Sequence, residues 1–348
     1  MTPVELSRTV LRAVRRAVDD GVLCVAVPER VVVTAPGPGG CGDYATNVAL
    51  QLARPAGRPP VDVAEILQAR LLSADGIRDV VVTGPGFLNI SLGDTASTAL
   101  VEEILRRGTR YGYAGGPSAD FIPLRCPHEV RAVVVMDALG RILRSQGAAV
   151  RTRCEDPLDP RWVDILGARV DADGAQESVS LPEFVVRPVP APADPDPLQL
   201  GRDAARWALL HPAGHDRPRI TDEHLVQRES NPLFRVRYAH ARTRALSRNA
   251  ADLGFDAEPG DVRHDVAALL ADHPRVLAQA AAHRAPDRLA RHLVTVADAV
   301  LPLLPAVLPR GAEKPSATHR ARLALAEAAG TVLAGGLSLL GIDAPDHL

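Results

Sequence analysis

Five arginines repeat along one predicted helix, and no acidic residue lies between the first and the last of them. A helix that carries several cations and no anion can present a positive stripe to the phosphates of a nucleic acid. The plainer interpretation of such a run is a solvated helix face. The five residues are Arg235, Arg237, Arg242, Arg244 and Arg248.

A second candidate site lies on a predicted strand at residues 87–92, where Leu88, Ile90 and Leu92 alternate with more polar positions. Alternation places Phe87 and Asn89 together on the other face of the strand. A ring that stacks on an extruded base, next to an amide that reads its edge, is a common RNA-binding arrangement. The alternative is a buried phenylalanine and an asparagine that faces a turn.

The remaining reactive residues predict no catalytic, cofactor or metal site. Cys126, His128 and Glu129 are close in sequence, but on a strand-to-helix turn three such side chains rarely converge on one metal or form a Cys–His nucleophile. The four cysteines form no CxxC pair, which suits a reducing compartment. The glycine-rich stretch at residues 37–42 lacks the GK[ST] ending of a phosphate loop.

Three regions must position these residues, and together they predict a multidomain α+β fold. Residues 1–115 are predicted to form a small α+β N-terminal domain, because helical and strand periodicities both occur there. Residues 116–200 begin with strand, helix and strand, a truncated Rossmann-like βαβ remnant followed by a linker. Residues 201–348 are predicted to form an all-α helical bundle.

The predicted elements follow hydrophobic periodicity and the Gly and Pro punctuation of the chain. Too few strands follow the βαβ unit to complete a doubly wound sheet. Strands are expected at 31–33, 80–82, 87–92, 121–124, 148–153, 165–170 and 184–189. Helices are expected at 6–18, 44–52, 61–72, 130–145, 201–210, 223–249, 262–284, 286–304 and 318–340.

Composition narrows the class of protein further. The formal net charge is -2 and the hydrophobic fraction is 46%, so a nucleic-acid site must be a local patch on an ordinary globular protein. No bilayer-length apolar run or secretory signal is evident, which predicts a cytoplasmic protein without a membrane partner. Lys314 is the only lysine, so chemistry that needs a lysine has to use it.

Three stretches of the chain resemble arginyl-tRNA synthetase, in that family's order. Residues 42–53 (GDYATNVALQLA) and 84–90 (GPGFLNI) resemble its N-terminal additional domain, and residues 231–242 (NPLFRVRYAHAR) resemble the opening helix of its anticodon-binding domain. Residues 321–348 resemble its last helix and chain end, with Leu348 where the family usually has methionine.

The resemblance implies two tRNA-binding surfaces and tRNA-Arg as the partner. Phe87 and Asn89 would face the D-loop. The anticodon stem and loop would meet Arg235, Tyr238, Arg242, Arg244 and Leu348. A protein partner is a further expectation.

The ATP-binding signatures of that family are not recognisable. Cys126-Pro127-His128-Glu129 stands where the HIGH signature is expected, and Glu129 would repel a triphosphate. The lysine-containing KMSKS signature is absent, and only about 75 residues separate Cys126 from the family-like stretch that starts at Gly201. These departures predict a noncatalytic tRNA-binding protein that needs no cofactor. The alternatives are an arginine-tRNA ligase or transferase with a reshaped or partner-completed active site, and a protein-interaction scaffold.

Overall fold

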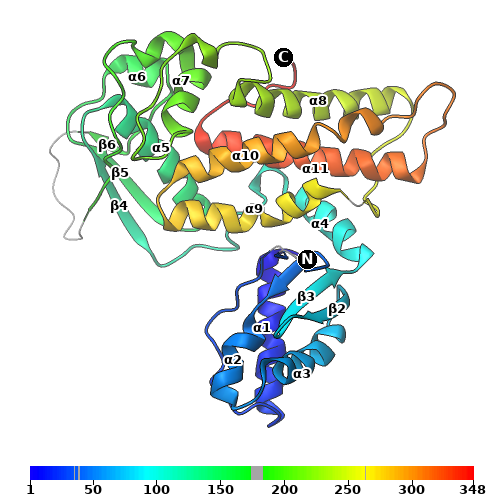
Figure 1. The fold of residues 1–348 in the computed structure, drawn as a ribbon. Helices are drawn as coiled ribbons and strands as arrows, with labels where there is room; N and C mark the ends of the chain where they lie inside the picture. The colour runs from blue at the N-terminus through cyan, green and yellow to red at the C-terminus, as the bar shows by residue number, and fades with distance from the viewer. Residues whose placement is uncertain (35, 38–39, 174–182, 263) are drawn as a thin grey trace. The chain divides into compact units, whose positions relative to one another are not determined.

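The computed structural model describes residues 1–34, 36–37, 40–173, 183–262 and 264–348. Two compact units are present: one comprises residues 1–102 and 259–272, the other residues 103–258 and 273–348. Figure 1 shows helices and small sheets in both, so the predicted mixed α+β class is confirmed. Residues 38–39 of the predicted glycine-rich loop and 174–182 of the predicted remnant lie outside the described residues.

The first unit combines a three-stranded antiparallel sheet with helices. The sheet has the order β1–β3–β2, and β2 and β3 form a hairpin in which Thr83 pairs with Phe87. The first helix begins in a capping box, where Thr2 accepts a hydrogen bond from the Glu5 backbone and the Glu5 carboxylate accepts one from the Thr2 backbone. The elements are α1 (Pro3–Asp19), β1 (Tyr44–Thr46), α2 (Val48–Ala56), α3 (Pro60–Leu72), β2 (Ile77–Thr83) and β3 (Phe87–Leu92). Helix α4 (Asp94–Arg107) has residues in both units.

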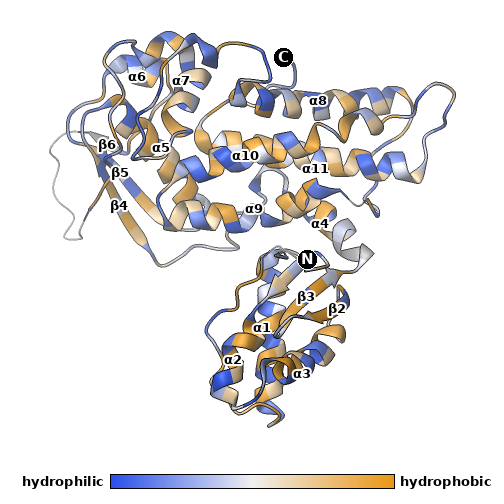
Figure 2. Cartoon of the chain, in the orientation of Figure 1, coloured by the Kyte–Doolittle hydropathy of each residue, from blue (hydrophilic) through white to orange (hydrophobic). Residues whose placement is uncertain are grey.

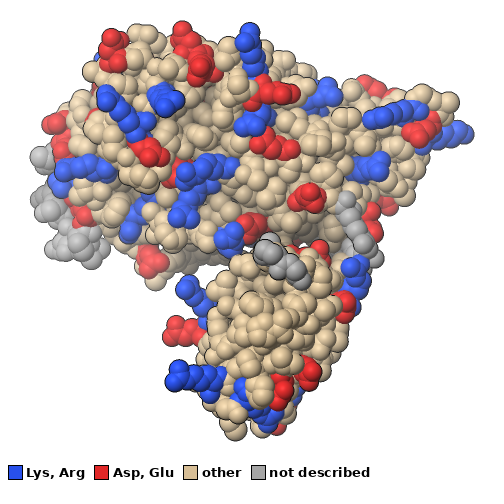
Figure 3. Space-filling model, in the orientation of Figure 1, with Lys and Arg blue, Asp and Glu red and all other residues tan. Residues whose placement is uncertain are grey.

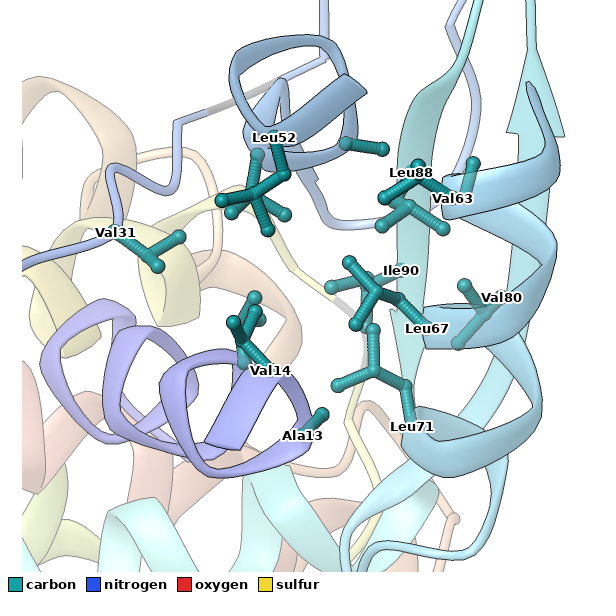
Figure 4. Packing of buried hydrophobic residues seen from close by; sticks show 14 of the residues in the cluster. Ala13, Val14, Val31, Leu52, Val63, Leu67, Leu71, Val80, Leu88 and Ile90 are labelled. Carbon is teal, nitrogen blue, oxygen red and sulfur yellow. The ribbon is translucent and has the colours of Figure 1, made fainter. Parts of the chain in front are cut away.

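The core of this unit lies between α1, α2, α3 and one face of the sheet (Figure 4). Leu88 and Ile90 of β3 are fully buried there, against Leu67 of α3 and Val14 of α1. Their burial fixes the strand register, because a shift by one residue would turn both side chains away from the core. Phe87 and Asn89 are therefore held on the opposite face, as alternation predicts.

Two predictions for this unit are wrong in detail. The predicted helix at 44–52 begins instead as strand β1, because Tyr44 to Thr46 pair with Ile90 to Leu88 before the chain turns into α2. The predicted strand at 31–33 is not part of the sheet, and only Thr34 forms a bridge, with Ala45. Strand pairing with other segments determines the structure at residues 44–46 and 31–33, and local propensity does not contain that information.

The second unit contains a parallel four-stranded sheet with the order β6–β5–β4–β7. Its centre is the predicted strand–helix–strand unit, in which β4 and β5 pair in register from Phe121 with Ala149 to Cys126 with Cys154. The outer strands are two residues long, and the strand expected at 165–170 is not formed. The elements are β4 (Phe121–Cys126), α5 (Val130–Ser145), β5 (Ala149–Cys154), α6 (Pro160–Asp164), β6 (Ala172–Asp173) and β7 (Phe184–Val185).

The rest of the second unit is helical, as predicted, and α11 packs against both α8 and α10. Glycines in α11 permit this close approach, because a Cβ on Gly330 would lie 2.2 Å from Thr243 and one on Gly336 would lie 2.4 Å from Leu293. Figure 2 shows apolar residues interleaved with polar ones along α8 and α10. The helices are α7 (Gly201–Leu210), α8 (Pro232–Asp252), α10 (Pro286–Val300) and α11 (Ala317–Leu340), with short 3-10 turns at Gly108–Arg110, Pro197–Leu200, Asp222–His224 and Leu304–Ala306. Helix α9 (Asp265–Ala282) has residues in both units.

Two segments have the length and composition of membrane-crossing helices, namely Pro286–Ala306 and Ala317–Leu340. In the second segment 78% of the apolar window is buried inside the protein, and in the first 50%. The apolar character of α11 is accounted for by its place against α8 and α10.

Candidate nucleic-acid interface

The β2–β3 hairpin presents the Phe87 ring to solvent. Phe87 is 40% exposed at the start of β3, and Val81 on the neighbouring strand is 37% exposed. Gly84 and Gly86 form the connecting turn with positive φ angles, and Gly86 lies so close to Pro60 that a Cβ would meet its carbonyl oxygen at 2.9 Å. The turn therefore holds the ring exposed at the hairpin end of β3, the central strand of the sheet.

Asn89 shares that face but is buried, with only 2% of its surface exposed. Its amide nitrogen donates to Thr83 Oγ1 at 2.7 Å and to the Val81 carbonyl at 3.3 Å, while its Oδ1 accepts from the Cys41 backbone at 3.3 Å. The amide thus ties the segment around Cys41 to the sheet. A direct contact of Phe87 or Asn89 with tRNA stays a prediction, and of the two only Phe87 is open.

Helix α8 carries the predicted arginines, and its start is fixed by Asn231. The Asn231 Oδ1 accepts from the Leu233 backbone at 3.0 Å, and its amide nitrogen donates to the His224 and Val226 carbonyls. Pro232 follows as the first helical residue, a favoured position for proline. The Asn-Pro pair thus caps the helix and holds the preceding loop against it.

Most arginines of α8 are neutralised by carboxylates from other elements. Arg235 lies 2.9 Å from Asp298 of α10, and Arg237 lies 3.4 Å from Asp203 of α7. Arg244 lies 3.2 Å from Asp346 near the chain end, and Arg248 donates to the Asp346 backbone carbonyl at 3.3 Å. Acids far along the chain therefore fold onto much of the predicted positive stripe, and its contact with phosphates stays a prediction. On the face drawn in Figure 3, acidic and basic side chains are interspersed.

Arg242 differs from these four arginines. It is exposed, and no ion pair to it is found among the described residues. It lies on the same side of α8 as Tyr238 and Phe234, since the three are spaced by four residues. Tyr238 is 38% exposed and its ring stacks on that of Phe234 with centroids 5.4 Å apart. We call Phe234, Tyr238 and Arg242 the α8 stripe; its aromatic surface and free cation suit a base and a phosphate.

The chain end lies beside the first turns of α8. Leu348 is 52% exposed and lines a cavity of about 300 Å³ together with Phe234, Arg237 and Leu225. The structure therefore places Leu348 beside the helix that carries Tyr238 and Arg242, and their contact with an anticodon stays a prediction. The contribution of Phe234 was missed by sequence reasoning, although its four-residue spacing from Tyr238 was a usable signal.

The strand-to-helix turn after β4 is occupied by the protein's own carboxylate. Glu129 Oε1 accepts from the Arg131 and Ala191 backbones at 3.0 and 3.1 Å, and its Oε2 accepts from the Ala132 backbone at 2.8 Å. The N-terminus of a helix at such a turn is where nucleotide phosphates commonly bind. Here Glu129 takes that position.

Cys126 and His128 do not join Glu129 in a reactive cluster. Cys126 is fully buried at the end of β4, and burial raises the pKa of its thiol, so it is not an activated nucleophile. His128 is exposed, and its ring lies 4.6 Å from that of Trp162. Among the described residues, no group of histidine, cysteine and acidic side chains is arranged to hold a metal.

An antiparallel N-terminal unit is thus followed by a parallel βαβ unit and a helical bundle that contains the capped basic helix α8. Residues 5–92 match the arginyl tRNA synthetase N terminal domain, and residues 236–348 match the DALR anticodon binding domain. The chain is an arginyl-tRNA synthetase-like protein, as the sequence resemblance predicted.

Similar proteins align with the whole length of the chain. Arginine–tRNA ligases of Frankia alni and Renibacterium salmoninarum are both 27% identical to it, with 100% of each chain covered. Among solved structures, the Thermus thermophilus arginyl-tRNA synthetase matches with a TM-score of 0.69 at 15% identity and 100% coverage of both chains. The Plasmodium falciparum enzyme matches with a TM-score of 0.70 at 8% identity and 99% coverage of both. These structures share the fold.

The prediction that the chain is not an enzyme is overturned by this finding, because the relatives that match its full length are arginine–tRNA ligases. The shortness of the middle region remains a fact of the sequence. The alignment with the Frankia alni ligase spans 553 positions and this chain has 348 residues, so 205 positions have no residue in this chain.

Proposed function

We propose that the protein binds tRNA, with tRNA-Arg as the preferred species, and takes part in arginine–tRNA ligation through an active site that is reshaped or completed by a protein partner. The observation that carries the proposal is the retention of both end domains in family order, in a chain whose full-length relatives are arginine–tRNA ligases. The cytoplasm, where tRNA and translation enzymes meet, is its proposed location.

The binding part of the proposal rests on two open surfaces. The α8 stripe offers the stacked rings of Phe234 and Tyr238 next to the exposed guanidinium of Arg242. Aromatic stacking on bases contributes about 1–3 kcal/mol for each base, and an arginine adds a phosphate contact. In the first unit, the exposed Phe87 ring is proposed to meet the D-loop. Two linked surfaces on one tRNA raise the effective concentration for the second contact.

Glu129 is one reason to propose an active site that is reshaped or completed by a partner. Its carboxylate already accepts three backbone hydrogen bonds at the start of α5, so a nucleotide phosphate at that turn has to displace it. The 205 alignment positions without a residue in this chain leave few elements from which to build an arginine pocket of the usual form. For these reasons the proposal includes a reshaped site or a partner that supplies the missing surface.

The test is arginylation of bulk bacterial tRNA with radiolabelled arginine and ATP. One arm contains the purified protein alone. The other arm adds fractionated host extract from which the full-length arginyl-tRNA synthetase has been removed. Arginylation that depends on this chain in either arm supports the proposal. The absence of chain-dependent arginylation in both arms refutes the ligation part. Sequencing of RNA that copurifies with the protein tests the binding part separately, and recovery without enrichment of tRNA-Arg would refute the stated preference.

A further inference from the structure

Four arginines converge on one cavity of the second unit, away from the α8 stripe. The cavity has a volume of about 470 Å³ and lies among the C-terminal half of α5, strand β5, the segment before β6 and the first turn of α7. Its lining includes only two acidic residues, Asp137 and Asp171. The four arginines are Arg141, Arg144, Arg169 and Arg202.

The two carboxylates are already engaged by the protein. Asp137 lies 2.6 Å from the fully buried Arg206 and 3.1 Å from Arg141. Asp171 accepts from the backbone and the hydroxyl of Thr152, at 2.7 and 2.9 Å, and lies 2.8 Å from Arg144. The acids therefore anchor Arg141 and Arg144 in place.

Arg169 and Arg202 are exposed and have no carboxylate partner among the described residues. Arg202 is nevertheless positioned, because it packs on Gly167, where a Cβ would lie 3.1 Å from the guanidinium carbon. Gly167 adopts a φ of +61°, so a side chain at this position would strain the backbone and also crowd Arg202. The glycine thus provides the backbone surface on which one free cation rests.

The surplus of positive charge is local and strong. Five guanidinium groups, counting Arg206 behind the cavity wall, are opposed by two carboxylates. Burial is the main cause that lowers the pKa of Arg206, and the neighbouring charges of Arg141 and Arg202 lower it further, against the effect of Asp137. Like charges gathered in this way repel one another, and an anion in the cavity would relieve that repulsion.

We propose that this cavity is a phosphate-binding site, formed by Arg169 and Arg202 with Arg141 and Arg144 beside them. Clustered guanidinium groups match phosphate oxygens because each offers a planar fork of donors. Four cations that converge from separate segments match adjoining phosphates. They match the dispersed carboxylates of an acidic protein surface less well. The phosphates belong either to an RNA backbone or to a free oligophosphate, and the test distinguishes the two sources.

The test compares wild type with the double variant Arg169→Ala/Arg202→Ala. Calorimetry measures the affinity for inorganic pyrophosphate, and filter binding over a range of salt concentrations measures the affinity for a tRNA-Arg transcript. Arg217→Ala is the matched control, since Arg217 is also exposed, belongs to the same unit and does not line the cavity. Loss of each charged contact should weaken phosphate binding about tenfold.

Loss of pyrophosphate binding alone assigns the site to a free oligophosphate. A weaker tRNA complex with a shallower salt dependence assigns it to the RNA backbone. Affinities for both probes that match those of Arg217→Ala overturn the proposal. Arg169→Lys/Arg202→Lys retains the charges and should recover part of the binding, and circular dichroism confirms folding of each variant. The outcome is independent of the arginylation assay.

Discussion

The side chain of Arg244 in the middle of α8 lies 3.2 Å from the carboxylate of Asp346, two residues before the chain end. The next turn of the helix holds the same residue, because Arg248 donates to the Asp346 backbone carbonyl. The C-terminal segment thus covers part of the basic surface that an anticodon stem is expected to use, so RNA phosphates have to compete with an internal carboxylate.

Asp346→Asn should therefore strengthen tRNA binding. The substitution frees Arg244 while it leaves the backbone carbonyl for Arg248, and the log–log salt slope should steepen by about 0.9 for one added phosphate contact. Asp343→Asn removes the same charge from the same segment without an arginine partner among the described residues, so it controls for net charge. Equal effects of the two variants in filter binding would contradict the specific competition.

The α8 stripe should contribute more to tRNA binding than its paired neighbours. Tyr238→Ala should cost about 1–3 kcal/mol of binding free energy, as expected when a base loses its stacking surface, and Tyr238→Phe should retain most of it. Arg242→Ala should lower the salt slope by about 0.9. Arg235→Ala is the matched control, because that arginine is already paired with Asp298. A larger effect for Arg235 than for Arg242 would place the RNA on another face of α8.

Substitutions at Phe87 and Asn89 should have different effects, one on tRNA binding and the other on the stability of the protein. Asn89→Ala removes a buried amide that makes three hydrogen bonds, so the free energy of unfolding should fall by about 1–3 kcal/mol. Phe87→Ala should leave the unfolding free energy within about 0.5 kcal/mol and weaken binding to tRNA with an intact D-loop. Denaturant titration and tRNA binding are measured on both variants. An Asn89→Ala protein of unchanged stability would show that the amide is free to serve RNA.

Acid should destabilise the second unit through His240. Burial is the main cause that lowers the pKa of His240 from 6.5 to about 4, and neither ring nitrogen has a hydrogen-bond partner in the described part of the chain. Between these values the unfolded chain binds a proton that the folded protein does not, so the free energy of unfolding falls as the pH falls. The loss reaches about 3 kcal/mol near the folded-state pKa.

His240→Leu should remove this part of the pH dependence and change stability little at neutral pH. Urea titrations at neutral pH and near the folded-state pKa measure the effect. His215→Leu is the control, since the His215 side chain is 87% exposed. If the two variants lose the same stability on acidification, the burial of His240 is not its cause.

Features that depend on near neighbours in the chain could be predicted from the amino-acid sequence. Alternation placed Leu88 and Ile90 on one face of a strand and Phe87 and Asn89 on the other, because successive strand residues point to opposite faces. The helix predicted at 223–249 begins nine residues too early, because α8 starts at Pro232. Asn231 followed by proline is a local capping signal for that start, and the periodicity alone did not register it. The strand–helix–strand unit around Asp137 was readable from periodicity, and the family resemblance followed from short contiguous strings.

Which of these residues are open to a ligand depends on contacts between distant parts of the folded chain. Asn89 is covered because the chain near Cys41 folds over its face of the sheet, 48 residues away in sequence. Arg244 is neutralised by Asp346, which is 102 residues away, and no pattern within α8 records that contact. The arginine cavity is assembled from segments that meet only after folding. Exposure and charge pairing depend on long-range contacts, whereas helical and strand periodicity depend on near neighbours, and this is why the elements could be predicted and the open surfaces could not.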